Sequence, residues 1–300
     1  MLSDNRYKGI LFMLLAALGF SIMGGAAKSL KDSFNAGQLV FFRNLVGLLV
    51  LIASFAANPP VNKGGKFHLL IFRGLMGTAA LYTLLYCILH IPLGTAMSYN
   101  LTSAVFIALF SFIFFREYNG KKVLLAVLLG FTGMLLIYKP VMHFPWFYHV
   151  AGLISGITSA LAYITVGRLN PYYDTRVIVS AFIITGLLVP SLFMIIGQFA
   201  GVPHDDVFFI RWKWPHGAEW LTVLLLGLAA LFGQYFVTKA YGADKAGIVS
   251  AVSYANILFS VFIGMMLGDP FPDPVSWTGI FCIIGSGIII SLVKRKSVAD

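Results

Sequence analysis

Long apolar segments are the feature that most limits what this chain can fold into. A transmembrane helix needs about 20 mostly apolar residues, and about ten segments approach that length, at 8–28, 36–56, 67–89, 93–115, 121–138, 148–168, 176–199, 218–240, 245–267 and 275–293. Charged residues are only 11% of the chain and hydrophobic residues 59%, whereas soluble globular proteins are about a quarter charged. The sequence predicts an all-α, multi-pass membrane protein with ten transmembrane helices, embedded in the lipid bilayer of the cell inner membrane.

The distribution of basic residues predicts the orientation. If all ten segments cross the membrane, the side with both termini carries 15 Lys and Arg residues and the other side 5, while Arg43 lies within the second segment. Lys and Arg accumulate in cytoplasmic loops, so both termini are predicted to be cytoplasmic. Because these residues are spread over many loops, we interpret the net charge of +10 as a topology signal and expect no nucleic-acid partner.

A pattern in the fourth segment recurs about 152 residues later. Pro92 to Glu117 reads PLGTAMSYNLTSAVFIALFSFIFFRE, and Asp244 to Asp269 reads DKAGIVSAVSYANILFSVFIGMMLGD. Both begin with a helix-starting residue, carry small and hydroxyl residues early, and end at a carboxylate. Five segments lie on each side of the interruption near residues 140–147, so we predict two inverted five-helix repeats, 1–143 and 144–300, as in many secondary transporters. A chance match between two apolar sequences is the alternative.

Several local motifs carry a family resemblance. They are FFRN in the second segment, FRGLMGTAALY in the third, HIPLGTA before the fourth, FFRE at its end, and then GFTGMLLIYKP. In these motifs the chain resembles the EamA-type branch of the drug/metabolite transporter superfamily, near the subgroup with S-adenosylmethionine and riboflavin transporters. The resemblance covers nearly the whole chain and implies a ten-helix transporter. The proline usual in this family before each terminal carboxylate is replaced by Ala104 and Asn256, so the resemblance does not predict a kink there.

Arg43 lies about two turns inside the second segment. A buried intramembrane arginine is costly and normally faces a water-filled cavity or a partner. Its planar guanidinium suits a carboxylate or phosphate of a substrate, and the alternative is a structural arginine that caps carbonyls or extends to the membrane surface. We interpret Lys28 as a residue that extends to the surface in this way, and Arg73 as a topology determinant or headgroup contact.

Uncharged polar residues at membrane depth must find partners, so they should face the interior of the bundle. Together with Arg43, the sequence therefore predicts a substrate site formed by Tyr82, Tyr86, Ser98, Tyr99, Asn100, Gln234, Tyr235, Ser253 and Asn256. For each residue, ordinary interhelical hydrogen bonding is the alternative. Such an aromatic and polar cavity with almost no negative charge suits a planar or zwitterionic metabolite better than a bare cation.

No arrangement typical of catalysis, metal binding or nucleotide binding is visible, so the sequence predicts neither an enzyme nor a cofactor. We interpret Glu117 and Asp269, at the ends of their segments, as structural. The sequence predicts a secondary-active transporter that moves a small polar or aromatic metabolite, such as an amino acid or a nucleoside-like or vitamin-like compound, by alternating access. A non-transporting membrane receptor or scaffold is the alternative, and formation of a homodimer is left open.

Overall fold

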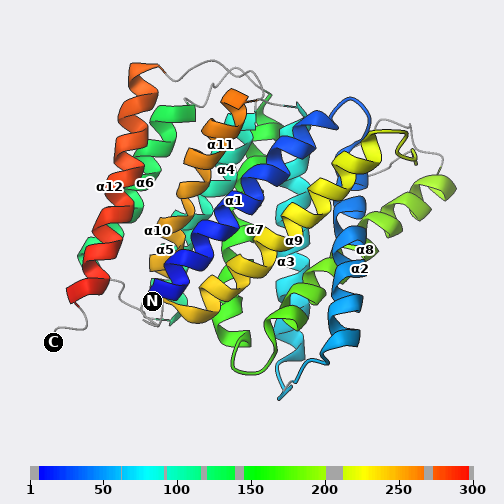
Figure 1. Cartoon of the computed structure of the whole chain (residues 1–300), viewed down its shortest axis with the longest axis horizontal. Helices are drawn as coiled ribbons and strands as arrows, with labels where there is room; N and C mark the ends of the chain where they lie inside the picture. Colours follow the sequence, from blue (N-terminus) through cyan, green and yellow to red (C-terminus); the bar gives the residue numbers. More distant parts are fainter. Residues whose placement is uncertain are drawn as a thin grey trace.

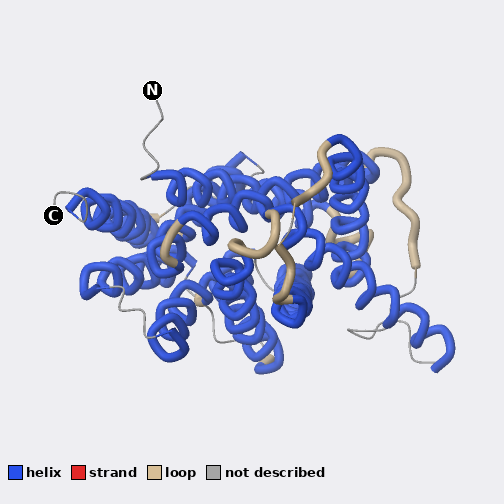
Figure 2. Tube along the Cα trace, turned by 90° about the horizontal axis from the view of Figure 1, so that it is seen from below, coloured by secondary structure: helices blue, strands red, loops and turns tan. Residues whose placement is uncertain are grey.

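The computed structural model is a bundle of α-helices, and no strand occurs in the residues it describes, which are 7–61, 63–90, 93–115, 120–138, 145–200, 212–266 and 273–296 (Figures 1 and 2). The helices are α1 (Lys8–Ser29), α2 (Ala36–Ala57), α3 (Phe67–His90), α4 (Leu93–Leu101), α5 (Ser103–Phe115), α6 (Gly120–Tyr138), α7 (Trp146–Leu169), α8 (Thr175–Ala200), α9 (Glu219–Ala243), α10 (Ala246–Ser253), α11 (Ala255–Met266) and α12 (Pro274–Lys296). The prediction of an all-α chain is confirmed over this part of the sequence.

The distribution of polarity is that of a multi-pass membrane protein. In the described ranges, seven helical segments are long and apolar enough to cross a membrane: Lys8–Ser29, Ala36–Ala57, Phe67–His90, Trp146–Leu169, Thr175–Gly197, Glu219–Ala243 and Ala246–Ile263. Large apolar side chains such as Leu49 and Leu188 are exposed on the outside, whereas Gln38, Asn44 and Gln234 are buried. An apolar exterior matches lipid, and buried polar groups find partners inside.

Two predicted segments, 93–115 and 245–267, are interrupted in the middle. The first is broken at Thr102, between α4 and α5, and the second at Tyr254, between α10 and α11. The Thr102 hydroxyl donates to the carbonyl of Tyr99 (2.6 Å), and the Ser253 hydroxyl donates to the carbonyl of Ser250 (2.6 Å). Such hydroxyl groups compete with the regular helical hydrogen bonds, so both predicted spans are interrupted at one residue although neither has a proline there.

The most extensive contacts between helices join segments that are far apart in the sequence. α1 packs along α9, α3 along α7, and α6 along α12, while α2 lies against α8. Figure 1 shows α6 and α12 at one edge of the bundle and α2 and α8 at the other, with α1, α3, α7 and α9 between them. Glycines permit the closest crossings: a Cβ on Gly19 would lie 2.9 Å from the backbone nitrogen of Gly233, and one on Gly74 would lie 2.7 Å from the carbonyl oxygen of Ala181. These crossings hold α1 close to α9 and α3 close to α8.

α1 begins and α12 ends on the same side of the bundle, the lower side in Figure 1. We call this the terminal side, and the α7–α8 connection also lies there. At the opposite end, Trp212 packs against Phe41 and Phe42, with both centroid distances at 5.2 Å. The predicted repeat boundary at 143/144 and the carboxylates Glu117 and Asp269 lie outside the described residues.

Candidate functional site

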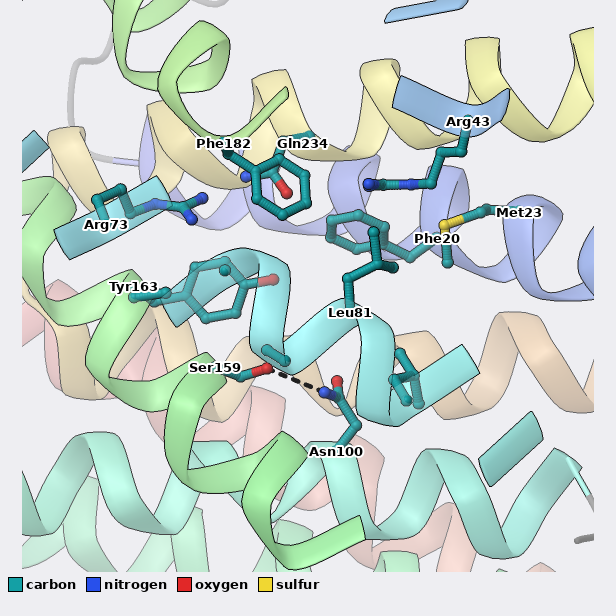
Figure 3. Close-up of a pocket in the computed structure, with 14 residues that line it drawn as sticks. Phe20, Met23, Arg43, Arg73, Leu81, Asn100, Ser159, Tyr163, Phe182 and Gln234 are labelled. Atoms are coloured by element: carbon teal, nitrogen blue, oxygen red, sulfur yellow. Dashed lines mark hydrogen bonds between the residues drawn. The ribbon is translucent and has the colours of Figure 1, made fainter. Parts of the chain in front are cut away.

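A cavity lies at the centre of the bundle, where the four central helices meet α2, α4 and α8. Its lining combines cationic, aromatic, aliphatic and amide side chains, namely Phe20, Met23, Arg43, Arg73, Gly77, Ala80, Leu81, Leu84, Asn100, Ser159, Ala162, Tyr163, Phe182 and Gln234 (Figure 3). The centres of water molecules can occupy about 50 Å³ of it. One water needs about 10–15 Å³ on this measure, so the cavity in this conformation has room for a few waters and must widen to admit a metabolite.

Two arginines reach this cavity from antiparallel neighbouring helices. Arg43 lies about two turns into α2 and Arg73 about two turns into α3. Because the helices run in opposite directions, the two side chains approach the bundle centre from its opposite ends, and Figure 3 shows their guanidinium groups pointing toward one another. Arg43 is 3% exposed and Arg73 1% exposed, so neither reaches water or the lipid surface.

Phe182 of α8 lies between the two arginines. Its ring centroid is 5.1 Å from Cζ of Arg43 and 5.4 Å from Cζ of Arg73. Arg73 also lies 5.7 Å from the ring centroid of Tyr163. Cation–π contacts of this kind stabilise a desolvated guanidinium by about 2 kcal/mol or more, which compensates only part of the several kcal/mol that burying each charge costs.

Several N–H donors of both guanidinium groups make no hydrogen bond. Nε of Arg43, and Nε and Nη2 of Arg73, have no hydrogen-bond partner. Nη1 of Arg43 makes a long hydrogen bond to Oδ1 of Asn44 (3.4 Å). Among the described residues that line the cavity, none is acidic. Both cations can therefore donate hydrogen bonds to an anion that enters the cavity.

Arg73 lies at a position that the sequence does not predict. A headgroup contact is wrong, because its side chain is buried and lines the cavity. The side chain extends toward Gly77, one helical turn deeper, where an added Cβ would collide with Nη1 of Arg73 and would lie 2.6 Å from the Phe182 ring. An arginine followed four residues later by a glycine, inside an apolar helix, is the sequence signal that could have identified it.

Three of the predicted site residues line the cavity together: Arg43, Asn100 and Gln234. Nδ2 of Asn100 donates to the hydroxyls of Ser155 (2.8 Å) and Ser159 (2.9 Å), the latter drawn in Figure 3. Gln234 is 4% exposed and makes only a long side-chain hydrogen bond within α9, at 3.4 Å. The Asn100 amide is thus held firmly through its nitrogen, whereas the Gln234 amide is held only weakly.

The three predicted tyrosines in α3 and α4 lie elsewhere. Tyr82 is buried in the packing between α3 and α8, Tyr86 lies near the C-terminal end of α3, and Tyr99 faces α7. The ring centroids of Tyr82 and Phe193 are 6.3 Å apart, and those of Tyr86 and Tyr148 are 5.7 Å apart. The hydroxyl of Tyr99 is hydrogen-bonded to His149. The structure does not bring these three rings into the cavity.

The remaining predicted residues also lie outside the cavity lining. Tyr235 faces the terminal side, where the ammonium group of Lys239 lies 4.7 Å from its ring centroid. Ser253 is buried at the break between α10 and α11. Asn256 donates to a backbone carbonyl of α1 (3.0 Å) and so joins α11 to α1. The side chain of Ser98 lies outside the part that the structure describes.

Two openings lie on the terminal side of the bundle. The first lies between the α2–α3 and α7–α8 connections and offers about 790 Å³ to water centres. The second, of about 480 Å³, lies between the end of α7 and the α9–α10 turn. Tyr163 lines both the cavity and the second opening, and it stacks on Tyr241. Tyr163 is therefore a shared wall of the cavity and the second opening.

A bundle of apolar helices around a buried cationic cavity defines a multi-pass membrane protein. Comparison with known proteins gives the family: residues 7–139 match the EamA-like transporter family. An uncharacterized transporter of Helicobacter pylori is 31% identical over 288 residues, with 95% of this chain and 94% of that protein covered. The chain belongs to the EamA-like transporter family of the drug/metabolite transporter superfamily.

A second relative supports the same family, and a solved structure supports the same fold. The pseudopaline exporter CntI of Pseudomonas aeruginosa is 30% identical over 297 residues, with 98% of this chain and 100% of that protein covered. A solved crystal structure shares the fold, with a TM-score of 0.72 and 19% identity over 97% of this chain and 96% of its own. The family resemblance of the sequence motifs is thus confirmed, and the protein functions in membrane transport.

Proposed function

We propose that this protein is a secondary-active transporter that moves a small polar metabolite across the cell inner membrane by alternating access. The central cavity is its substrate site, with Arg43, Asn100 and Gln234 as binding residues and Arg73 added to them. The observation that carries this proposal is the pair of buried guanidinium groups with unused hydrogen-bond donors. Ionisable residues at membrane depth are costly and are usually retained for function.

The helix contacts support two inverted repeats, 1–143 and 144–300, with ten spans. If α1 of the first repeat corresponds to α7 of the second, the α1–α9 contact has its counterpart in α7–α3, and α2–α9 in α8–α3. The α1–α11 contact matches α7–α5 in the same way. The breaks at Thr102 and Tyr254 fall at the same offset as the sequence repeat. Two equivalent halves can exchange conformations and so alternate access to a central site.

The sidedness follows from the positive-inside rule. With both termini in the cytoplasm, the terminal side and its two openings face the cytoplasm, and the ring pair of Tyr163 and Tyr241 is the inner barrier. Bacterial relatives with full-length matches support an inner-membrane location. Since one of them is named an exporter, we propose export as the direction.

The proposal is tested by comparing metabolites in cells and medium for strains that express the wild type, Arg43→Ala or no protein. We expect specific metabolites to accumulate in the medium only with the wild type. Lys121→Gln, which removes an exposed cation at the start of α6, is the matched control and should behave as wild type. If correctly inserted wild-type protein changes no metabolite in either compartment, transport is excluded and the receptor or scaffold alternative takes its place.

A further inference from the structure

We infer that the ligand of the central cavity carries two separate anionic groups, of which two carboxylates are the simplest case, one bound by Arg43 and the other by Arg73. The inference rests on the proposed function only in taking this ligand to be the transported metabolite. It specifies the substrate class more narrowly than the general polar or aromatic metabolite expected from the sequence.

The charge of the cavity sets the number of anionic groups. Arg43 and Arg73 are both buried, and no described residue of the lining supplies a compensating carboxylate. A ligand with one negative charge would leave one guanidinium uncompensated in a poorly solvated interior, which is strongly unfavourable. A ligand with two negative charges makes the occupied cavity neutral. A cationic or neutral ligand would leave both charges uncompensated.

The position of Phe182 indicates that the two anionic groups are separated. Its ring lies between the arginines, with the two Cζ atoms 5.1 and 5.4 Å from its centroid (Figure 3). The Cζ atoms are therefore no farther apart than the sum of these distances, which a short carbon chain can span. The aliphatic side of the cavity, formed by Leu81 and Met23, suits the apolar middle of such a chain.

The unused donors suit carboxylates. Nε and Nη2 of Arg73 form one edge of the guanidinium, and neither has a hydrogen-bond partner. This edge presents two parallel N–H groups, the arrangement that binds both oxygens of a carboxylate. Nε of Arg43 is likewise without a partner. Each arginine can thus hold one carboxylate by charge-assisted hydrogen bonds.

The test measures thermal stabilisation of the purified full-length protein by five probes: glutarate, adipate, valerate, cadaverine and glycerol phosphate. Ligands that bind the folded state raise its stability by mass action. We expect glutarate or adipate to stabilise the wild type, and the monocarboxylate, the diamine and the single phosphate ester to have much weaker effects. Arg43→Gln and Arg73→Gln should each weaken the apparent affinity for the dicarboxylate by more than about tenfold, because each loses a charge-assisted hydrogen-bonded pair.

Control variants distinguish an effect on ligand binding from an effect on the stability of the fold. Glutamine removes a buried charge without adding volume, so both variants should unfold without ligand at temperatures near the wild type, and Arg43→Lys and Arg73→Lys should retain part of the response. Lys121→Gln should respond as wild type. The inference is overturned if valerate or glycerol phosphate stabilises the wild type as well as the dicarboxylates do, if no dicarboxylate stabilises it, or if only one arginine matters.

The same protein in liposomes separates this inference from the proposed function. If a dicarboxylate binds through both arginines but is not moved across the bilayer, the transport proposal fails and the assignment of the ligand class stands. If the protein moves neutral or cationic metabolites and Arg43→Gln and Arg73→Gln have no effect, transport stands and the inference fails.

Discussion

Tyr163 of α7 and Tyr241 of α9 stack almost parallel, with ring centroids 5.1 Å apart and an interplanar angle of 14°. Tyr163 is the residue that lines both the central cavity and the second opening on the terminal side, and Tyr241 is only 4% exposed. A stacked aromatic pair contributes about 0.5–1.5 kcal/mol beyond its burial. In the proposed transport cycle this ring pair is the inner barrier, and an energy of this size is small enough to be overcome in each cycle.

Removal of one ring should therefore open the cavity. In a Cys282→Ala background, we expect a thiol reagent to label Ser159→Cys, a cavity position, several-fold faster when Tyr241→Ala is added. Tyr163→Phe keeps the stacked ring and should leave the labelling rate unchanged. Labelling rates measured by mass spectrometry test this directly. An equal rate with and without Tyr241→Ala would show that the ring pair is not the barrier.

Gly77→Ala should disturb the site more than the fold. The added methyl group would collide with the guanidinium of Arg73 and would lie 2.6 Å from the ring of Phe182. Overpacking of this kind typically costs about 1–3 kcal/mol, and the flexible arginine can move more easily than the ring, so we expect a modest fall in melting temperature and a large loss of ligand response. Gly285→Ala is the control, since the nearest atom to its new Cβ is 3.5 Å away. If both variants keep full ligand response, Arg73 does not need its observed position.

Asn100 and Asn256 should respond differently to replacement by alanine. Asn256 donates to the carbonyl of Ala17 (3.0 Å) and connects α11 to α1, away from the cavity. We expect Asn256→Ala to lower thermal stability by about 1 kcal/mol or less, the range of interhelical hydrogen bonds in membranes, without changing ligand affinity. Asn100→Ala should weaken ligand binding, because Asn100 lines the cavity. Loss of affinity in Asn256→Ala would contradict this division.

Sequence reasoning identified the helices well because long apolar segments are local signals. The first predicted segment, 8–28, matches Lys8–Ser29, and the second, 36–56, matches Ala36–Ala57. The breaks at Thr102 and Tyr254 have no such signal, because hydroxyl groups that bond to their own backbone can interrupt a helix without proline or glycine.

The site was only partly predictable. Arg43 was identified because its charge lies deep in an apolar segment. Arg73 was assigned to the membrane surface, since its Cα lies near the end of the third segment and the direction of its side chain depends on the space at Gly77. Tyr163 and Phe182 resemble ordinary apolar packing in the sequence. Only tertiary structure shows that they contact the arginines.

Acidification should weaken the junction between α2 and α8. Asp174 is partly buried, which opposes ionisation, but hydrogen bonds and charge from Arg176 lower its pKa below the usual value. Arg176 in turn donates to the carbonyls of Ser54 (3.1 Å) and Asn58 (2.8 Å). A lowered pKa stabilises the fold fully above the unfolded-state pKa of about 3.9, and this contribution is lost as the pH falls through the folded-state pKa.

We therefore expect the melting temperature to fall as the pH is lowered from about 4 to about 2, and to fall less in Asp174→Asn, which cannot lose this charge. Thermal unfolding in detergent across this range tests the prediction. Lys121→Gln is the control for a change of surface charge and should show the wild-type pH dependence. An identical acid-induced fall in Asp174→Asn and wild type would show that Asp174 contributes nothing.

Export of a dianion through this cavity should be driven by the membrane potential. Moving one charge across 100 mV is worth about 2.3 kcal/mol, so two negative charges leaving a negative interior gain about 4.6 kcal/mol per 100 mV. No described residue of the cavity lining is a carboxylate or a histidine that could carry a coupled proton near neutral pH. In liposomes loaded with labelled glutarate, a negative interior set by a potassium gradient and valinomycin should accelerate efflux severalfold over a positive interior. A pH gradient alone should have little effect. Efflux that follows the pH gradient and ignores the potential would show proton coupling instead.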